Sequence, residues 1–339
     1  MSQPTSPPAE RPAPAAGISG ARRVWSRLSE FDEIGVIGAF LAISLALTLA
    51  SDKFLHAENL LSVARQASYI GIMAVGMVFV ISMGDIDLSV GAMLMLVTVS
   101  MAVLFQRGYD TLLVIVAGLL IGALCGAVNG LISVLLRIPT IIVTLGTLSV
   151  FRGLGLVVSG GAPISGYDQD TWFFRIIGGK FLGIWMSVWA MLLVALVGWI
   201  LFTRTAFGRR VQAIGSNRQA ARFSGIRISY YRVLVMTLMG FIVGVAAVAL
   251  IAFQRAGNPA SGPGQELYVI AATIIGGTAL TGGSGSVPGA IIGALIVWLI
   301  QNGLTLLAVS PNWAVAATGL VIIAAVTLDY FIKRRPGAG

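Results

Sequence analysis

Charged residues are scarce: they make up only 10% of the 339 residues, whereas hydrophobic residues make up 57%. A typical soluble domain carries about 25% charged residues. A soluble fold of this size would lack the charge to cover its surface, and the mean hydropathy of +0.92 indicates lipid as the solvent. In lipid the backbone must satisfy its own hydrogen bonds, so only helices or a closed barrel can span. The apolar runs are long and continuous, without the alternation of barrel strands, which favours helices.

Residue types that build metal and catalytic centres are also nearly absent. A single cysteine, Cys125, excludes a disulfide framework, and a single histidine, His56, has no second His or Cys with which to share a metal. No GxxxxGK[ST] phosphate loop occurs, because Gly178-Gly179-Lys180 lacks the first glycine and the hydroxyl residue. We therefore expect the chain to bind no metal or cofactor, and no ATP by that route.

Long apolar runs dominate what is present, and they predict an all-α polytopic membrane protein with about ten transmembrane helices, some short or broken. Residues 1–33 are predicted as an N-terminal tail, 34–332 as the transmembrane domain and 333–339 as a C-terminal tail. The eighth span is short enough to be a broken or re-entrant helix. The predicted spans are 34–50, 66–84, 88–105, 111–136, 141–158, 184–203, 232–254, 268–281, 288–309 and 312–332.

Basic residues predict the orientation of these spans. Residues 204–232 hold seven arginines and no acidic residue, so the 204–231 loop is expected to be cytoplasmic. Ten spans place both termini on the same side as this loop, and most of the 22 basic residues then lie inside. The net charge of +9 is thus explained by cytoplasmic loops, and no nucleic-acid partner is expected.

The basic loop itself contains a predicted short helix. Ser216-Asn217 can cap a helix over Arg218–Phe223, which Gly225 would end. One interpretation is a docking helix for a cytoplasmic partner. The alternative is that the arginines only set topology and bind anionic membrane lipid.

Two carboxylates lie between apolar spans, in the string Gly84-Asp85-Ile86-Asp87-Leu88-Ser89. Acidic residues at membrane depth are costly, so Asp85, Asp87 and Ser89 are candidates for a pathway or gate. The alternative is a cytoplasmic turn in which Asp87 or Ser89 caps the next helix. A paired-carboxylate hydrolase is not indicated, because no other catalytic group accompanies the two acids.

Glycine is abundant and patterned. Residues 276–293 carry seven glycines, and we interpret the part that includes Gly282, Gly283 and Gly285 as a hinge near a gate; a tight turn is the alternative. Gly118, Gly122, Gly126 and Gly130 recur every four residues, as do Gly285, Gly289 and Gly293. This spacing leaves a flat helix stripe, which predicts close helix packing within the subunit or at a dimer contact.

Neutral polar residues are scattered within the spans. Each can hydrogen-bond to a neighbouring helix, or line a pathway for an uncharged polyol. Trp172, Trp185 and Trp189 are predicted interfacial anchors on the outer side, where residues 163–175 would form part of a platform for a binding protein. The polar residues are Asn129, Thr144, Thr147, Gln301 and Asn302.

Several motifs together resemble sugar ABC importer permeases of the ribose/xylose/arabinose type, within the branched-chain amino acid/ribose permease superfamily. The resemblance covers residues 34–332. One departure is Asp85, where the family often has a second glycine. The motifs are GMVFVISMGDIDLSVG (76–91), IPTIIVTLGTLSVFRGLGLVVSGG (138–161), GRRVQAIGSNRQAARFSGI (208–226), GGTALTGGSGSVPGAIIGALI (276–296) and QNGLTLL (301–307).

The resemblance implies a permease subunit in the bacterial inner membrane, with both termini cytoplasmic, that translocates a ribose-like pentose or a hexose. It implies three partners: a cytoplasmic ABC ATPase that binds the ATP and Mg, a periplasmic substrate-binding protein, and a second permease copy in a homo- or heterodimer. The coupling residues would be Gly208, Arg209, Asn217, Arg218, Ala221, Arg222 and Gly225.

Three alternatives to a sugar importer stay open at this point. Related permeases handle branched-chain amino acids or nucleosides. An ion-coupled secondary carrier would need an intramembrane ion site, for which only Asp85, Asp87 and Glu266 are available. A membrane scaffold would have no use for so many glycine breaks.

Overall fold

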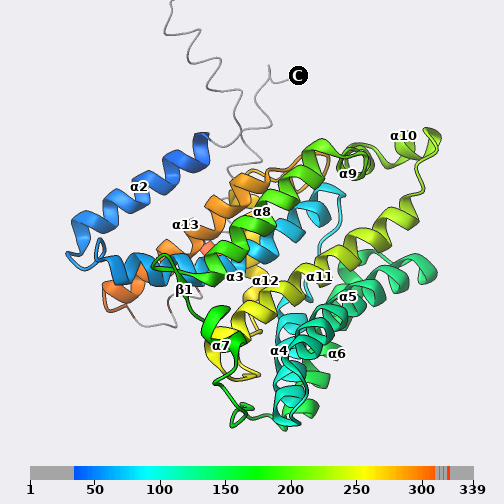
Figure 1. Ribbon diagram of the computed structural model, residues 1–339. Helices are drawn as coiled ribbons and strands as arrows, with labels where there is room; N and C mark the ends of the chain where they lie inside the picture. The colour runs from blue at the N-terminus through cyan, green and yellow to red at the C-terminus, as the bar shows by residue number, and fades with distance from the viewer. Residues whose placement is uncertain (1–33, 310–312, 314–315, 317–318, 321–339) are drawn as a thin grey trace, which may run out of the picture.

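The computed structural model describes residues 34–309, 313, 316 and 319–320, and the described chain is a bundle of helices (Figure 1). The one sheet among these residues is a two-residue hairpin. In chain order the elements are α2 (Ile34–Ala50), α3 (Ala57–Ser82), α4 (Val90–Gln106), α5 (Thr111–Leu136), α6 (Thr140–Ser159), α7 (Trp172–Ile176), β1 (Lys180–Phe181), β2 (Ile184–Trp185), α8 (Met186–Arg204), α9 (Ala206–Ser216), α10 (Arg218–Phe223), α11 (Ile228–Gln254), α12 (Gln265–Ile275) and α13 (Val287–Leu306).

Six of the described helices are long and apolar enough to cross a membrane: α3, α5, α6, α8, α11 and α13. Three shorter apolar helices, α2, α4 and α12, accompany them. Every predicted span up to residue 309 coincides with one of these helices, which confirms the all-α fold class. The last predicted span, 312–332, lies largely outside the described residues, as do the predicted tails at 1–33 and 333–339.

Some predicted boundaries were wrong. Helix α3 begins at Ala57 rather than at residue 66, because its first turns contain Glu58 and Arg65, which interrupt the apolar pattern without interrupting the helix. Helix α12 ends at Ile275 rather than at residue 281, because a glycine-rich turn follows it. At about 1.5 Å per residue its 11 residues are too short to cross the apolar layer, in agreement with the interpretation of a short or broken span.

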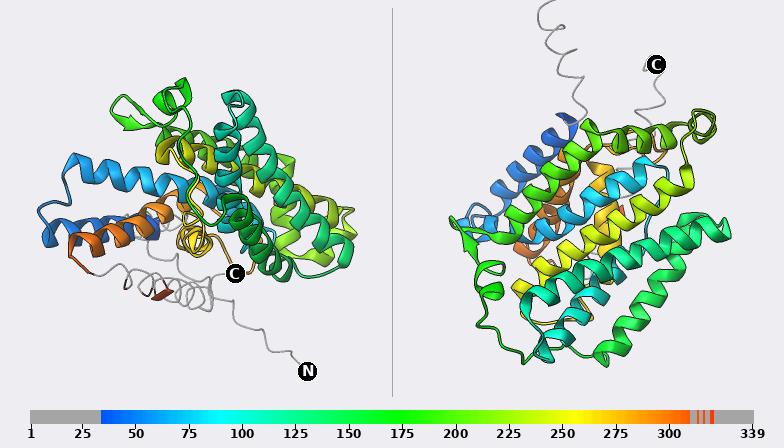
Figure 2. Two further views of the ribbon diagram at one scale, coloured as in Figure 1. Left: turned by 90° about the horizontal axis from the view of Figure 1, so that it is seen from below. Right: turned by 45° about the vertical axis from the view of Figure 1, so that its right-hand side comes forward.

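Helix α3 is the centre of the bundle. Every residue from Ala67 to Met83 is buried, and the helix contacts α8, α11, α12 and α13. Such all-round burial explains why this stretch is apolar on every face rather than on one stripe. By contrast, α2 lies at the edge of the bundle, on the side away from α5 and α6 (Figures 1 and 2).

The predicted glycine stripe on α5 is a packing surface within the subunit. A Cβ atom at Gly122 would collide with the carbonyl oxygen of Gly240 on α11, and one at Gly126 with that of Met236. Gly130 likewise faces the Val233 backbone. Glycine is therefore required for the backbones of α5 and α11 to touch. The second glycine series, Gly285, Gly289 and Gly293, does not lie on one helix face. Gly289 and Gly293 of α13 face the backbone of α12 and its C-cap, whereas Gly285 lies in the turn before α13.

The bundle has two distinct ends. Helices α9 and α10 lie at one end, called the α10 end, and α7 with the β1–β2 pair lies at the opposite end, called the hairpin end (Figure 1). At the hairpin end Tyr167 stacks against Phe105 and Phe174, and burial raises the pKa of the Tyr167 hydroxyl above its usual range. The predicted platform of residues 163–175 is thus anchored by an aromatic cluster.

Candidate functional site

Three segments that the sequence singled out meet at the α10 end: the α3–α4 connection at 83–89, the start of α10, and the glycine-rich turn at 276–286. The Gly283 N–H donates to the Ser82 carbonyl at 2.8 Å, and the Ser82 hydroxyl donates to the Ser284 carbonyl at 3.1 Å. Gly282 and Gly283 also pack against the backbone of Gly215 and Ser216. The end of α3 is therefore held directly between the basic segment and the glycine-rich turn.

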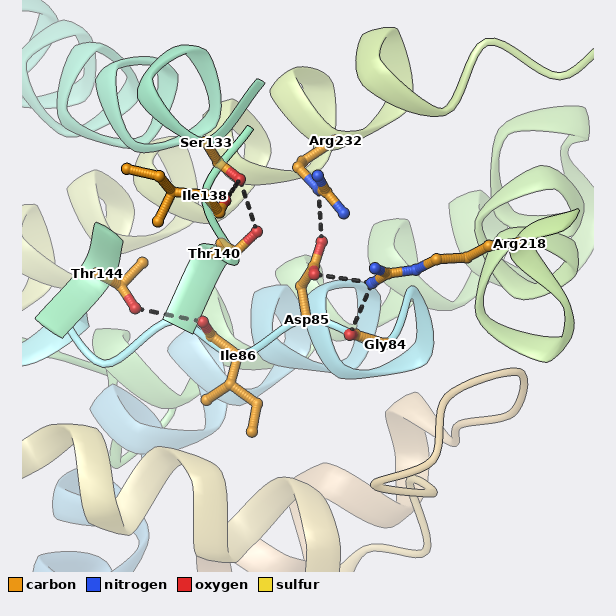
Figure 3. A network of polar contacts seen from close by, with 9 residues as sticks. All are labelled: Gly84, Asp85, Ile86, Ser133, Ile138, Thr140, Thr144, Arg218 and Arg232. Carbon is orange, nitrogen blue, oxygen red and sulfur yellow. Dashed lines mark hydrogen bonds and ion pairs between the residues drawn. The ribbon is translucent and has the colours of Figure 1, made fainter. Parts of the chain in front are cut away.

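An ionic network joins α10 to the α3–α4 connection (Figure 3). Asp85 accepts hydrogen bonds from Arg218 and from Arg232, one on each carboxylate oxygen, both at 2.9 Å. Arg218 also donates to the Gly84 carbonyl at 2.9 Å. The Asp85 side chain is only 6% exposed, and those of Arg232 and Arg218 are 16% and 46% exposed. The acid is thus buried between two bases, and charge-assisted hydrogen bonds connect α10 and α11 to residues 84–85.

Asp87 takes part in a separate, buried polar chain. Its Oδ1 accepts from the backbone N–H and the hydroxyl of Ser89, at 2.8 and 2.6 Å, and Asn129 of α5 donates to the Ser89 hydroxyl oxygen at 2.8 Å. Asp87, Ser89 and Asn129 are all fully buried. The alternative predicted that Asp87 or Ser89 caps the next helix, and this part is wrong, because no side chain caps α4 and Asp87 closes a local turn within the protein instead. That these residues form a cytoplasmic turn stays a prediction.

Helix α6 supports the same connection from the other side. The Thr144 hydroxyl donates to the Ile86 carbonyl at 3.3 Å (Figure 3). The Thr147 hydroxyl donates one turn back to the Thr144 carbonyl at 3.4 Å. Hydroxyls and amides thus surround residues 86–89, without a further charged side chain in these contacts. The predicted candidates Asp87, Ser89, Asn129, Thr144 and Thr147 are close neighbours in space.

A cavity of about 460 Å³ opens beside the ionic network. It is lined by Gly84 and Asp85, by the end of α5 and the start of α6, and by the two network arginines. Ser133 and Thr140, whose hydroxyl oxygens lie 3.1 Å apart, contribute polar groups to its wall (Figure 3). Its volume falls within the roughly 300–1,000 Å³ of small-molecule sites.

The predicted helix Arg218–Phe223 is confirmed. The Asn217 side chain caps it by accepting from the Ala220 N–H at 2.9 Å, and Gly225 adopts the left-handed φ of +80° that ends such helices. Ala221 is buried and faces the bundle, whereas Arg222 and Gly225 are exposed. Sequence reasoning missed Phe223, whose ring is 81% exposed next to these arginines. An exposed aromatic ring on a basic helix is typical of a protein-docking surface.

Helix α9, which precedes α10, was not predicted. Thr205 caps it by accepting from the Gly208 N–H at 3.3 Å. Gly208 is buried, since a side chain there would strike the Phe202 backbone, and Arg209 is exposed. A three-residue spacing of the buried Gly208, Val211 and Ile214 was the available signal.

The glycines of the 276–286 turn have distinct structural reasons. Gly282 and Gly283 both adopt the left-handed region, with φ of +82° and +88°, which non-glycine residues rarely occupy. Gly285 lies against Val78 and Ser82 of α3, with no room for a side chain. The segment is a tight turn in contact with both α3 and the basic segment, so the two interpretations of this stretch are compatible.

Asn302 lies apart from the other candidates. It exchanges two amide hydrogen bonds with Asn59 of α3, at 2.7 and 3.1 Å. These bonds tie α13 to the first turn of α3, toward the hairpin end. Among the described residues, no group of three or more His, Cys, Asp or Glu side chains could hold a metal ion.

Comparison with known proteins gives the family. Residues 59–326 match the family described as branched-chain amino acid transport system / permease component. The chain is 40% identical over 296 residues to the ribose import permease protein RbsC of Bacillus subtilis (strain 168), covering 86% of this chain and 92% of that protein. It is 33% identical over 338 residues to the L-arabinose ABC transporter permease protein AraH of Azospirillum brasilense, covering 99% and 98%.

A third relative is the D-allose transport system permease protein AlsC of Escherichia coli (strain K12), 35% identical over 311 residues, which cover 91% of this chain and 93% of that protein. No solved structure matches the chain. The chain therefore belongs to the ABC importer permease family that residues 59–326 match. It is a multi-pass membrane protein and a transport subunit rather than an enzyme, and such permeases work with a separate ATPase and a substrate-binding protein.

Proposed function

We propose that this chain is the transmembrane subunit of an importer that moves a monosaccharide across the bacterial inner membrane. ATP and Mg are bound by the partner ATPase, and this chain contributes no cofactor. Two permease copies, as a homo- or heterodimer, form the pathway. Ten spans place both termini and the α10 end in the cytoplasm, and the hairpin end faces the periplasmic binding protein.

The observation that carries this proposal is the ionic network of Asp85. Arg218 belongs to the helix that presents Phe223 and Arg222 outward, and the same arginine holds the connection that leads to the buried polar groups around Asp87. An ATPase that binds and shifts α10 therefore pulls on Asp85, and through it on the segment between α3 and α4. The glycine-rich turn, hydrogen-bonded to Ser82, moves with it.

The choice of a sugar rests on two observations. Relatives with one third or more identity carry names that specify ribose, L-arabinose or D-allose. The groups that neighbouring helices bring to residues 86–89 are the Asn129 amide and the Thr144 hydroxyl, neutral groups that can exchange hydrogen bonds with a polyol without the desolvation cost of a charge. An amino acid would instead require a partner for each of its two charges.

Co-purification from detergent-solubilised native membranes tests the coupling role. We expect the wild-type chain to bring down an ABC ATPase, and the variant Arg222→Glu/Phe223→Ala to bring down much less, because both side chains point outward from α10. These positions are preferred to Arg218, whose replacement would also break the network with Asp85. The control is Arg107→Glu, which makes the same charge change at an exposed position on the loop after α4.

Equal recovery of the ATPase with the α10 variant and the control would refute the docking assignment. If the wild-type chain recovers no ATPase, even with nucleotide trapping, an ion-coupled carrier becomes the better explanation, and Asp85 and Asp87 become the residues to replace in uptake assays.

A further inference from the structure

A second cavity, of about 170 Å³, lies between α3, α4, α11, α12 and α13, away from the ionic network. It is near the hairpin end, because one of its walls is the last turn of α11, whose Phe253 contacts Trp185 of β2. Its lining is unusual for the interior of a membrane protein. Three aromatic and three amide side chains face it: Tyr69, Phe253, Trp298, Gln66, Gln254 and Gln265.

Three residues of the cavity lining each carry a buried polar atom without a hydrogen-bond partner in the described part of the chain: Arg65 Nε, Tyr69 Oη and Trp298 Nε1. The two nitrogens are donors only, whereas the Tyr69 hydroxyl can donate or accept. Native proteins satisfy the great majority of buried polar groups, so three such atoms around one cavity indicate oxygens of a bound molecule. Neither the ionic network nor the polar chain of Asp87 uses these atoms.

The position of Arg65 adds to the argument. Its guanidinium lies 3.6 Å from the Phe253 ring centroid and 5.1 Å from that of Trp185, so aromatic faces hold the cation in place. This stacking orients the edge of the group. On the other side, the Ser261 hydroxyl donates to the Gln254 side chain at 3.0 Å, which ties the loop after α11 to the cavity wall. The polar groups of the lining are thus held in position before any ligand binds.

The chemistry of the lining selects the class of ligand. Aromatic rings offer apolar faces to the C–H side of a sugar ring, while amides and N–H donors suit its hydroxyls. Among the described residues no acidic side chain lines the cavity, so a cation or an ammonium group would lack a partner there. The volume is below the roughly 300–1,000 Å³ of sites for drug-sized ligands, so an occupant is restricted to about one ring.

We propose that this cavity is a monosaccharide-binding site within the permease subunit itself, with Arg65, Trp298 and Gln265 as hydrogen-bonding residues. The inference rests on the proposed import of a sugar and adds a place on this chain that recognises it. Substrate selection is then shared between the separate binding protein and the permease.

Protection of an introduced thiol tests the site. The chain is prepared with Cys125→Ser, which removes its one cysteine, and with Ser261→Cys at the cavity, in nanodiscs that leave both faces open. A methanethiosulfonate reagent labels the thiol in the presence of D-ribose, L-arabinose, D-allose or L-leucine. The matched control is Ser165→Cys, an exposed serine of the loop between α6 and α7 that is not part of the cavity.

We expect at least one of the three sugars to slow labelling of Ser261→Cys about tenfold when present at about ten times its Kd, because the free fraction is then about one tenth. Labelling of Ser165→Cys stays unchanged. Adding Trp298→Phe, which removes only the Nε1 donor and keeps an aromatic ring, raises the sugar concentration for half-protection roughly two- to tenfold, as expected for one lost hydrogen bond.

Uptake of the radiolabelled sugars in cells that carry the chain with its native partners separates the two proposals. If cells take up a sugar but no sugar slows the labelling of Ser261→Cys, the cavity assignment is wrong and the importer function stands. Protection by L-leucine alone overturns the assignment to a sugar. Absence of both sugar uptake and protection refutes the proposed function together with the site.

Discussion

The ionic network of Asp85 makes a quantitative prediction, because its two partners differ in exposure. The Arg232 side chain is 16% exposed, so its charged hydrogen bond to the nearly buried carboxylate is worth about 1.5–3 kcal/mol. The Arg218 side chain is 46% exposed, and solvent screening reduces its pair to about 0.2–1 kcal/mol. We therefore expect the Asp85–Arg232 coupling energy to exceed the Asp85–Arg218 coupling energy by at least about 1.5-fold.

Two double-mutant cycles measure these energies, one from Asp85→Ala and Arg232→Ala and the other from Asp85→Ala and Arg218→Ala. The assay is equilibrium unfolding in mixed micelles of the purified chain, followed by loss of helical signal. Asp85→Asn provides a third variant, since it keeps a hydrogen-bond acceptor and removes the charge. We expect it to be intermediate between the wild type and Asp85→Ala.

Equal coupling energies for the two arginines would refute the inference from exposure. A larger coupling for Arg218 would mean that α10 lies deeper in the solubilised protein than in this structure.

Three further substitutions test a helix contact, a glycine turn and an amide pair. Gly126→Ala should destabilise the chain by about 1–3 kcal/mol, because the added methyl meets the α11 backbone, whereas Gly146→Ala in α6 meets open space and should not; unfolding in mixed micelles compares them. Gly283→Val should abolish uptake but leave membrane insertion intact, since the left-handed turn would be strained; unchanged uptake would contradict this. Asn302→Leu should cost about 0.6–1.7 kcal/mol of stability by breaking the amide pair with Asn59, with uptake unchanged apart from expression level.

Local signals explain which parts of the structure were predictable from sequence. Helix α10 was predicted to the residue because its cap, Asn217, and its terminating Gly225 lie within one short stretch. The apolar spans were predictable because lipid imposes a length and a composition on each. The extra turns of α3 were not, since the half-buried Arg65 stacks there on the Phe253 ring of α11, a contact that sequence does not reveal.

Contacts between distant segments explain what was missed in the site. Asp85 was recognised as a departure from the family pattern, but its partners lie 133 and 147 residues further along the chain. The glycine spacing on α5 predicted close packing without indicating α11 as the partner. Asn302 was grouped with the pathway residues because its type matched, and only its contact with Asn59 separates it from them.

The backbone contact between α5 and α11 also restricts how the protein can change shape. Two helices that touch through glycines have no layer of side chains that could slide or repack between them, so they travel as one rigid body. Alternation between inward- and outward-facing states must then take place at boundaries around this pair. The turn at 276–286 and the non-helical residues 84–89 are such boundaries. Distances measured between spin labels on α5 and α11 should stay constant through the transport cycle.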